Sequence, residues 1–317
     1  MLDITSLRVF LAAAEEGSFT RAAERLHLSQ SAVSQHIQNL ERAYGVQLFL
    51  REGRSVKLSE SGQIILPLVR EILGTTKLLE EALLHANDSI GGDLMIGCST
   101  SAGKYILPVL LAGFKERYPA VFPRVRVMPR DLIVEHLLNR VLPFGVFSCK
   151  VEHASLECTP LFEDRIVLIV PVTHPWARFG RALPSDLLDQ PIILREENSG
   201  TREALNEALR AQGIAPEMLH VTMELGNPEA IEMSVERGLG IAFVSEMVAA
   251  RHVALGRIKV IEVEGLDLRR TIYLARRRDT HLTRAQTLFW EFAKEQYPFI
   301  RERLCPQLTG AISPSSG

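Results

Sequence analysis

The stretch that decides the fold is Ser18–Tyr44, which reads SFTRAAERLHLSQSAVSQHIQNLERAY. Ser18 can cap one short helix and Ser29 a second, because serine side chains accept hydrogen bonds from the free amides of a helix's first turn. Between these helices, His27-Leu28 leaves room only for a tight turn. An earlier apolar helix ends at Gly17. Two short helices joined in this way describe a helix-turn-helix, whose second helix enters a DNA major groove.

The exposed face of the second helix is suited to reading base edges. Residues 30–40 contain no acidic side chain, and their Gln, Ser and His residues offer both donors and acceptors. A basic hairpin through Gly53 follows and supplies phosphate contacts. The residues predicted to bind DNA are Thr20, Arg21, Gln30, Ser31, Ser34, Gln35, His36, Arg51 and Arg54.

Charge limits how strongly this segment can hold DNA of random sequence. Residues 1–60 contain seven basic and seven acidic side chains, and the whole chain of 317 residues carries a formal charge of −2. We therefore expect weak non-specific binding. A helical domain that binds another protein remains the alternative.

Composition places the chain among globular proteins of two or three domains. Hydrophobic residues make up 46% and charged residues 23%, which excludes wholesale disorder and a mainly membrane-embedded protein. The first residues lack the pattern of a signal peptide, and the four cysteines form no CxxC pair. We expect a cytoplasmic protein without a metal site.

A long amphipathic helix is predicted over residues 61–87. Its apolar residues recur in alternating steps of three and four, which is typical of a helix that packs along a partner helix. A core helix of the next domain is the alternative, but the length of the stripe favours dimerisation. The residues predicted at the dimer contact are Ile65, Leu68, Ile72 and Leu79.

From Gly92 onward, short apolar strands alternate with helical stretches, which predicts an α/β architecture with mostly parallel sheets. Polar segments follow three of the strands, and ligands in such sheets bind at the carboxyl ends of strands. Plain helix capping by each segment is the alternative, yet three similar strand ends favour a cleft for a small anion. Its predicted residues are Ser99, Thr100, Ser101, Arg130, Asn198, Ser199, Gly200, Thr201, Arg202 and Asn227.

One known family matches this sequence in residue type and spacing at Phe10–Ala23, Leu28–Ile37, Leu48-Phe49 and Arg51. On these residues, the sequence resembles the opening of that family, the LysR-type transcriptional regulators. The second half resembles its regulatory domain, for example at Ser199–Arg202 and Gly238–Ala242. The run at 195–202 with the later Asn-Pro-Glu-Ala-Ile at 227–231 is similar to a subgroup that controls carbon-fixation and inorganic sulfur assimilation genes.

The resemblance implies a fold of class α/β with an N-terminal all-α winged helix-turn-helix. It implies a winged helix-turn-helix over 1–60, a dimerisation helix over 61–89, an effector-binding domain over 92–305 and a disordered tail over 306–317. The effector domain is expected to be two-lobed and Rossmann-like, resembling type 2 periplasmic binding proteins. Lobe I would hold 92–163 and 267–303, and lobe II 164–266.

The resemblance also implies a mechanism and a set of partners. The protein would regulate transcription by binding promoter or operator DNA as a dimer or homotetramer. A small, anionic metabolite bound between the lobes would change DNA binding or bending. RNA polymerase is a candidate partner, and no cofactor apart from the effector is expected. Two departures near the cleft, Pro143 and Pro129-Arg130, distinguish this chain from the family pattern.

Three other classes fit the sequence less well. An enzyme on a bilobal α/β fold is the main alternative, but the chain has no nucleophile elbow, HExxH motif or P-loop. A peroxide-sensing regulator would need a reactive cysteine near residues 198–201, and Cys98 and Cys149 are instead expected to be buried in strands and inert. A free-standing receptor for small anions would leave the first 60 residues without a role.

Overall fold

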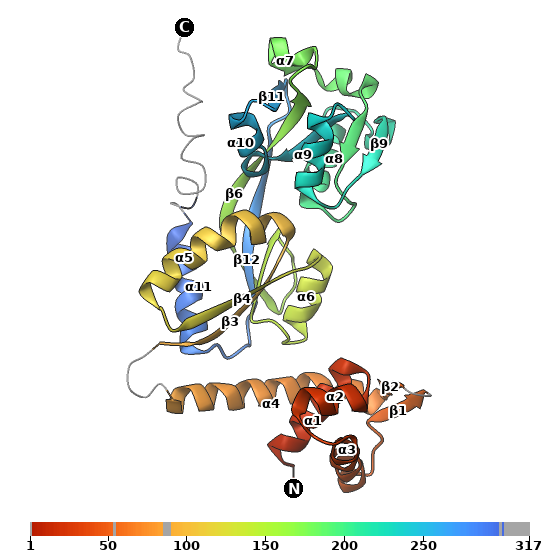
Figure 1. Cartoon of the computed structure of the whole chain (residues 1–317), viewed down its shortest axis with the longest axis vertical. Coiled ribbons are helices and arrows are strands. Elements are labelled where there is room, and N and C mark those ends of the chain that lie inside the picture. The colour runs from red at the N-terminus through yellow and green to blue at the C-terminus, as the bar shows by residue number, and fades with distance from the viewer. Residues whose placement is uncertain (1, 53–54, 85–89, 298–299, 301–317) are drawn as a thin grey trace. The chain divides into compact units, whose positions relative to one another are not determined.

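The computed structural model describes residues 2–52, 55–84, 90–297 and 300. These fall into two compact units. The first contains the elements from α1 to α4 with the short segments Leu138–Val141 and Thr280–Thr283, and the second contains the other described residues. In Figure 1 the colour follows residue number along the chain, from red at the N-terminus through yellow and green to blue.

The first unit is built on three capped helices, α1 (Ile4–Glu16), α2 (Phe19–Leu26) and α3 (Gln30–Tyr44). The side chains of Asp3, Ser18 and Ser29 cap them by accepting hydrogen bonds from backbone amides of the first turn. Gly17, His27 and Gly45 end them in the left-handed conformation. The predicted helix bounds and turn are therefore confirmed.

The core of this unit lies between the three helices and a two-stranded antiparallel hairpin, β1 (Phe49–Glu52) and β2 (Ser55–Leu58). Phe10, Ala22, Val33 and Ile37 are buried there, and Phe49 packs its ring against Phe10 and Phe19. Small Ala22 and Ala23 let α2 approach its neighbours closely. The hairpin tip with Arg54 lies outside the described residues.

Helix α4 (Glu60–Leu84) is the long helix that the apolar stripe predicts. Val69 is buried and Ile65 packs against the core of the first unit. Leu68 and Leu79 are instead 55% and 60% exposed in the single chain. One side of the apolar stripe therefore packs in the core of the first unit, whereas no described residues cover the other side.

The second unit is a mixed α/β domain with β3–β12 and α5–α11. Its strands are β3 (Gly92–Cys98), β4 (Val121–Val127), β5 (Phe144–Ser148), β6 (Leu156–Pro171), β7 (Arg181–Ala182), β8 (Ile192–Leu194), β9 (Val221–Glu224), β10 (Ile241–Ser245), β11 (Ile258–Val263) and β12 (Leu268–Arg277). Its helices are η1 (Ala102–Ile106), α5 (Leu107–Arg117), α6 (Arg130–Leu138), α7 (Trp176–Phe179), η2 (Pro184–Asp189), α8 (Gly200–Ala211), η3 (Pro216–Met218), α9 (Pro228–Glu236), α10 (Glu246–Ala254) and α11 (Arg284–Gln296).

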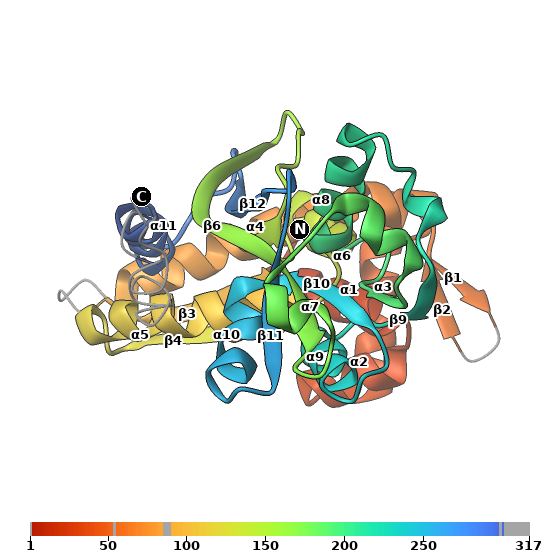
Figure 2. The ribbon, with the colours of Figure 1, turned by 90° about the horizontal axis from the view of Figure 1, so that it is seen from above.

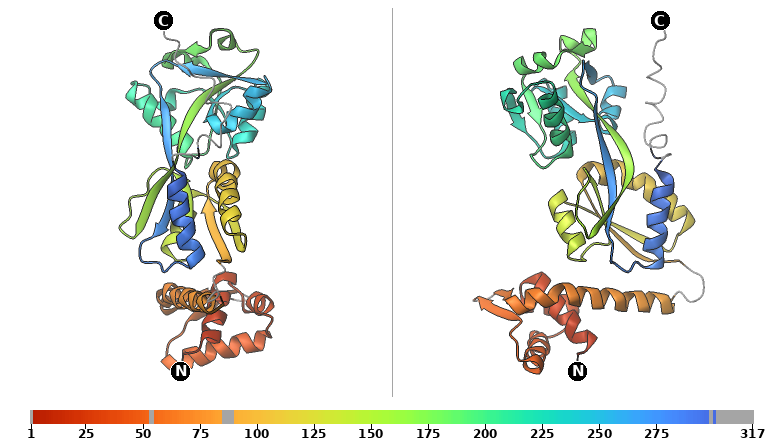
Figure 3. Two further views of the ribbon diagram at one scale, coloured as in Figure 1. Left: turned by 90° about the vertical axis from the view of Figure 1, so that its left-hand side faces the viewer. Right: turned by 180° about the vertical axis from the view of Figure 1, so that it is seen from behind.

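The sheet order β4-β3-β5-β12-β6-β10-β8-β9 divides this unit into two lobes. In lobe I, β3 pairs in parallel with β4 and β5, and in lobe II, β8 pairs in parallel with β9 and β10. The long strands β6 and β12 are antiparallel, and both views of Figure 3 show them side by side from one lobe to the other. Seen from above in Figure 2, α7 lies by β11, with which it is in contact.

The prediction of mostly parallel sheets holds inside each lobe but is wrong for the strands that join the lobes. β6 is antiparallel to β10, β11 and β12, and β12 is also antiparallel to β5. The apolar run Ile166–Val170 marks only the second half of β6, which extends over 16 residues. These two long strands connect the lobes, because β6 pairs with β10 and β11 of lobe II, β12 pairs with β5 of lobe I, and the two strands pair with each other.

Candidate functional site

The helix predicted to read DNA, α3, presents the expected polar face. Gln30, Ser31 and Gln35 are exposed, and Ser34 and His36 are half-buried. On this face Gln35 Nε2 donates to Asn39 Oδ1 at 2.8 Å, which leaves the Gln35 carbonyl oxygen available to a partner.

The predicted phosphate contacts are placed only in part. Thr20 and Arg21 are exposed at the start of α2, and the Arg21 guanidinium donates to the Glu16 carbonyl oxygen. The backbone of Arg51 lies in β1, but its side chain is not described. Arg54 lies outside the described residues.

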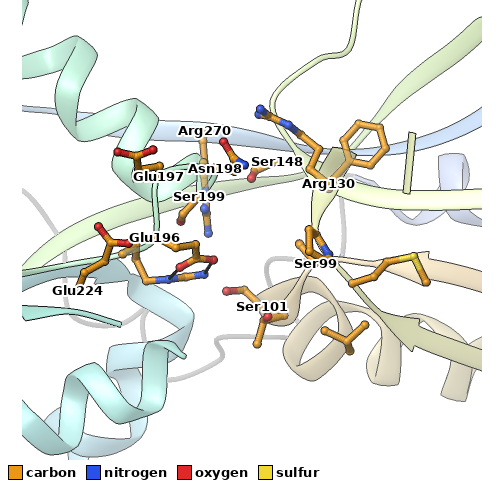
Figure 4. Close-up of a pocket in the computed structure, with 17 residues that line it drawn as sticks. Ser99, Ser101, Arg130, Ser148, Glu196, Glu197, Asn198, Ser199, Glu224 and Arg270 are labelled. Atoms are coloured by element: carbon orange, nitrogen blue, oxygen red, sulfur yellow. Dashed lines mark hydrogen bonds and ion pairs between the residues drawn. The ribbon is translucent and has the colours of Figure 1, made fainter. Parts of the chain in front are cut away.

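A cavity of about 530 Å³ lies between the two lobes of the second unit. Ser99, Thr100 and Ser101 line it from lobe I, where β3 ends. Asn198–Gly200 line it from lobe II, where β8 has ended and α8 begins. Figure 4 shows Ser99, Ser101 and Arg130 on one side, facing Glu196, Ser199 and Glu224 on the other. The polar segments that follow β3 and β8 therefore lie across one cavity from each other, as the strand ends predict.

The start of α8 combines helix capping with a contribution to the cavity. Ser199 is 5% exposed and its hydroxyl accepts from the Thr201 amide at 3.3 Å. Gly200 has no room for a side chain, because a Cβ atom there would lie 2.1 Å from Ser148 Oγ. The close approach of α8 to Ser148 thus needs glycine and brings the positive end of the helix to the cavity.

The charges lining the cavity are balanced, and its arginines are already paired with carboxylates. Three arginines (Arg130, Arg195, Arg270) and three glutamates (Glu196, Glu197, Glu224) line it. Arg195 forms two hydrogen bonds to Glu196, at 2.7 and 2.8 Å. An anion entering here would have to share or exchange these partners, because no arginine among the lining residues lacks a carboxylate.

Arg130 forms an ion pair across the lobes. Its Nη1 lies 2.9 Å from Glu203 Oε2, an atom that also accepts from Cys149 Sγ at 3.0 Å. Burial alone would raise the pKa of Glu203, but the hydrogen bonds from Arg130 and Cys149 lower it overall. The same bonding raises the pKa of the Arg130 guanidinium. The pair therefore remains charged and connects α6 of lobe I with α8 of lobe II.

A buried network ties the cavity to the strands that join the lobes. The Asp164 carboxylate on β6 accepts from Arg270 Nε at 2.8 Å and from Ser245 Oγ at 2.6 Å. Arg270 Nη1 then donates to Thr201 Oγ1 at 2.9 Å. Strands β6, β12 and β10 and helix α8 are thus joined by one charged pair and two hydroxyls.

Several predicted effector residues have other positions. Thr201 is 2% exposed and bonds to Arg270, behind the cavity lining. Arg202 pairs with Glu224 at 2.5 Å, and Asn227 caps α9 through the amides of residues 229 and 230. Thr201, Arg202 and Asn227 are therefore not among the described residues that line the cavity. Sequence reasoning missed Arg195 and Arg270; Arg195 directly follows a predicted strand, whereas only the three-dimensional pairing of β12 brings in Arg270.

The prediction that Cys149 is buried in a strand is wrong. Cys149 is half-buried and follows β5 with a left-handed φ of 71°. Burial and the hydrogen bond to Glu203 raise the pKa of its thiol to about 11, and burial raises that of Cys98 to about 12. Both thiols are therefore protonated at neutral pH, unlike the thiolates that react with peroxide.

Neither a metal-binding cluster nor a membrane-spanning helix occurs in the described part of the chain. Within the described ranges, no group of three or more His, Cys, Asp or Glu side chains is placed to hold a metal ion. No described helix is long and apolar enough to span a membrane.

Comparison with known proteins agrees with this architecture. The family model of the LysR substrate binding domain matches residues 87–298, and that of the bacterial regulatory helix-turn-helix protein of the lysR family matches residues 4–63. The combination defines a DNA-binding transcriptional regulator with a domain for a small-molecule effector. The chain belongs to the LysR family.

Three similar proteins cover between 66% and 95% of this chain. A probable RuBisCO transcriptional regulator of Cyanophora paradoxa is 33% identical over 91% of this chain and 90% of its own. Full-length OxyR of Pseudomonas aeruginosa shares the fold with a TM-score of 0.73 at 23% identity, over 95% of both chains. The regulatory domain of Synechocystis CcmR, solved in complex with 2-PG, has a TM-score of 0.60 at 24% identity and covers 66% of this chain and 98% of its own.

Proposed function

We propose that the cavity between the lobes binds a small anionic metabolite, either phosphorylated or a sulfur oxyanion. The observation that carries this proposal is the meeting of the Ser99–Ser101 hydroxyls with the N-terminus of α8 across one cavity. Helix N-termini and hydroxyl groups bind small oxyanions because both offer hydrogen-bond donors without a bulky side chain. Arg130, Arg195 and Arg270 supply positive charge at the same place.

The paired arginines suggest how binding changes the protein. An anion that attracts Arg130 competes with Glu203, which belongs to the other lobe. Binding would therefore exchange a contact between the lobes for a contact with the ligand. A ligand can shift the arrangement of the lobes only by such a difference in contacts.

The relatives support this class of ligand. The probable RuBisCO regulator of Cyanophora paradoxa is similar over most of the chain, and CcmR binds 2-PG in a domain of the same fold. We accordingly place the protein among regulators of carbon-fixation or inorganic sulfur genes. Its partner is promoter DNA, so we propose that it acts in the cytoplasm.

Calorimetric titration of the full-length protein with 2-PG, phosphorylated sugars, sulfate, sulfite and thiosulfate tests the proposal. Ser101 is 6% exposed and lines the cavity, so Ser101→Ala should weaken binding of the active anion by about tenfold, the value of one lost hydrogen bond of about 1.4 kcal/mol. Ser234→Ala on α9, where the hydroxyl bonds only to its own helix, is the matched control. Failure of every anion to bind would refute the anionic class. The bound metabolite should be recovered unchanged, because we propose a receptor and not an enzyme.

We further propose that Gln30, Ser31, Ser34, Gln35 and His36 read the operator, and that Thr20, Arg21, Arg51 and Arg54 hold its phosphates. The exposed polar face of α3 supports this assignment. Gln35→Ala should reduce discrimination between operator and random duplex, whereas Arg21→Ala should weaken both similarly. If Gln35→Ala lost the same affinity for operator and for random duplex in a competition assay, its role in reading bases would be rejected.

Self-association through α4 is the third part of the proposal. Leu68, Ile72 and Leu79 are at least 39% exposed in the single chain, and a partner helix would cover them. Leu79→Lys should shift the full-length protein to a smaller assembly in sedimentation experiments. Lys77→Ala, on the same helix, is the control, and an unchanged assembly in the Leu79 variant would reject the contact.

A further inference from the structure

A chain of three side chains connects the start of α1 with the middle of α3. Ser6 Oγ lies 2.6 Å from Asp3 Oδ2 and 3.0 Å from His36 Nδ1. Ser6 is 3% exposed, so little water competes for its hydroxyl. His36 stands on the helix that carries the proposed DNA-reading face.

The direction of these hydrogen bonds is fixed by proton counting. A serine hydroxyl has one proton, and a carboxylate can only accept. Ser6 therefore donates its proton to Asp3, and its oxygen can only accept from His36. Hence Nδ1 of His36 carries a proton, and in the neutral imidazole Nε2 presents a lone pair.

Asp3 is well placed to hold this direction. Its other oxygen, Oδ1, caps α1 by accepting from the Ser6 amide at 2.8 Å. Its carboxylate thus has one oxygen for the helix cap and the other for the Ser6 hydroxyl. Hydrogen bonds from the Ser6 side chain and backbone lower the pKa of Asp3, so this group stays ionised near neutral pH.

We propose that Asp3 and Ser6 set the base preference of the protein by making His36 Nε2 a hydrogen-bond acceptor. An acceptor in the major groove meets the amino group of adenine or cytosine, whereas guanine and thymine offer acceptors at the corresponding positions. A lone pair is also a poor partner for a phosphate oxygen, which is itself only an acceptor. This inference rests on the proposed DNA-reading role of α3.

We call the hydrogen bonds that run from His36 through Ser6 to Asp3 the relay. One conservative substitution should reverse the direction of these hydrogen bonds. In Asp3→Asn, the amide oxygen keeps the cap to the Ser6 amide, since asparagine caps helices as well as aspartate does. The amide nitrogen then takes the place of Oδ2 and donates to Ser6 Oγ. The Ser6 proton turns to His36 Nδ1, and Nε2 becomes a donor suited to guanine or thymine.

The experiment is selection of binding sites from a randomised duplex library by the full-length protein at pH 8, where ordinary imidazoles are neutral. The variants are Asp3→Asn and Ser6→Ala, with His36→Ala to identify the base position that His36 contacts. Thr5→Ala removes an exposed hydroxyl from the neighbouring position of α1 and is the matched control. Melting curves and affinity for the wild-type consensus outside that position show whether each variant is folded.

The wild type and Thr5→Ala should select adenine or cytosine at the His36 position. Asp3→Asn should change that selection to guanine or thymine, and Ser6→Ala should abolish it, each by about fivefold to tenfold in relative affinity. An unchanged base at this position in folded Asp3→Asn and Ser6→Ala proteins would overturn the relay. If the wild type enriches no sequence at all, the proposed reading role of α3 fails instead.

Discussion

Substitutions of Asp164 and Arg270, a buried ion pair, should have strongly non-additive effects on the free energy of unfolding. The side chains of Asp164 and Arg270 are 1% and 7% exposed, the Asp164 carboxylate accepts hydrogen bonds from Arg270 Nε and Ser245 Oγ, and its Oδ2 lies 2.7 Å from Arg270 Nη2. Removing one partner leaves a buried charge unpaired, so Asp164→Leu and Arg270→Met should each lower the free energy of unfolding by about 3–5 kcal/mol. The double variant should lose about 3 kcal/mol or less, because it leaves no unpaired charge.

The two tryptophans make the measurement possible in the intact protein. Trp176 belongs to lobe II and Trp290 to lobe I, so fluorescence during urea unfolding reports the effector domain and not the DNA-binding helices. A double-mutant cycle from these curves should give a coupling energy of at least about 3 kcal/mol. Additive losses would refute the reasoning, since they would mean that the pair does not act as one unit between the lobes.

Three further predictions concern other groups. Burial raises the pKa of the Glu232 carboxyl, which is 1% exposed, from 4.5 to about 8, so the folded state binds more protons than the unfolded state. The free energy of unfolding should therefore fall as the pH rises from about 4.5 to 8, by up to about 1.4 kcal/mol per pH unit. Urea titrations of Glu232→Gln should show that this dependence of stability on pH is removed. Ser29→Ala removes the cap that accepts from the Ala32 amide, and should lower the helicity and stability of the first unit by about 1 kcal/mol in thermal melts monitored by circular dichroism; an unchanged melting temperature would contradict the cap. Gly200→Ala should destabilise the effector domain by about 1–3 kcal/mol in urea, because the new methyl group would collide with Ser148; retained stability and anion affinity would show that α8 can move away.

The parts that sequence could predict are those determined locally. Ser18 and Ser29 cap helices and Gly17 ends one because the backbone within a few residues decides these positions. The polar segment at 198–200 was likewise identifiable, since it directly follows a strand and precedes a helix.

The parts that sequence could not predict depend on distant pairing. Arg270 reaches the cavity only because β12 lies beside β6, in a register that aligns it with Asp164, 106 residues away in the chain. Asn227 shows the opposite error: its position after a strand resembles that of Ser199, yet it only caps its helix. A cap and a ligand contact use the same side chains, and only the neighbouring lobe distinguishes them.

The sheet order has a consequence for synthesis on the ribosome. β12 lies between β5 and β6, and α11 contributes the buried Phe289 and Trp290 to lobe I, so the last segments of the chain complete the lobe that was begun first. Lobe II has all its strands, from β6 to β11, once residue 263 has been made. The nascent protein therefore has all the strands of its second lobe before those of its first, and a message truncated after β11 yields a chain whose ligand cavity lacks Arg270 and whose lobe I lacks β12 and α11.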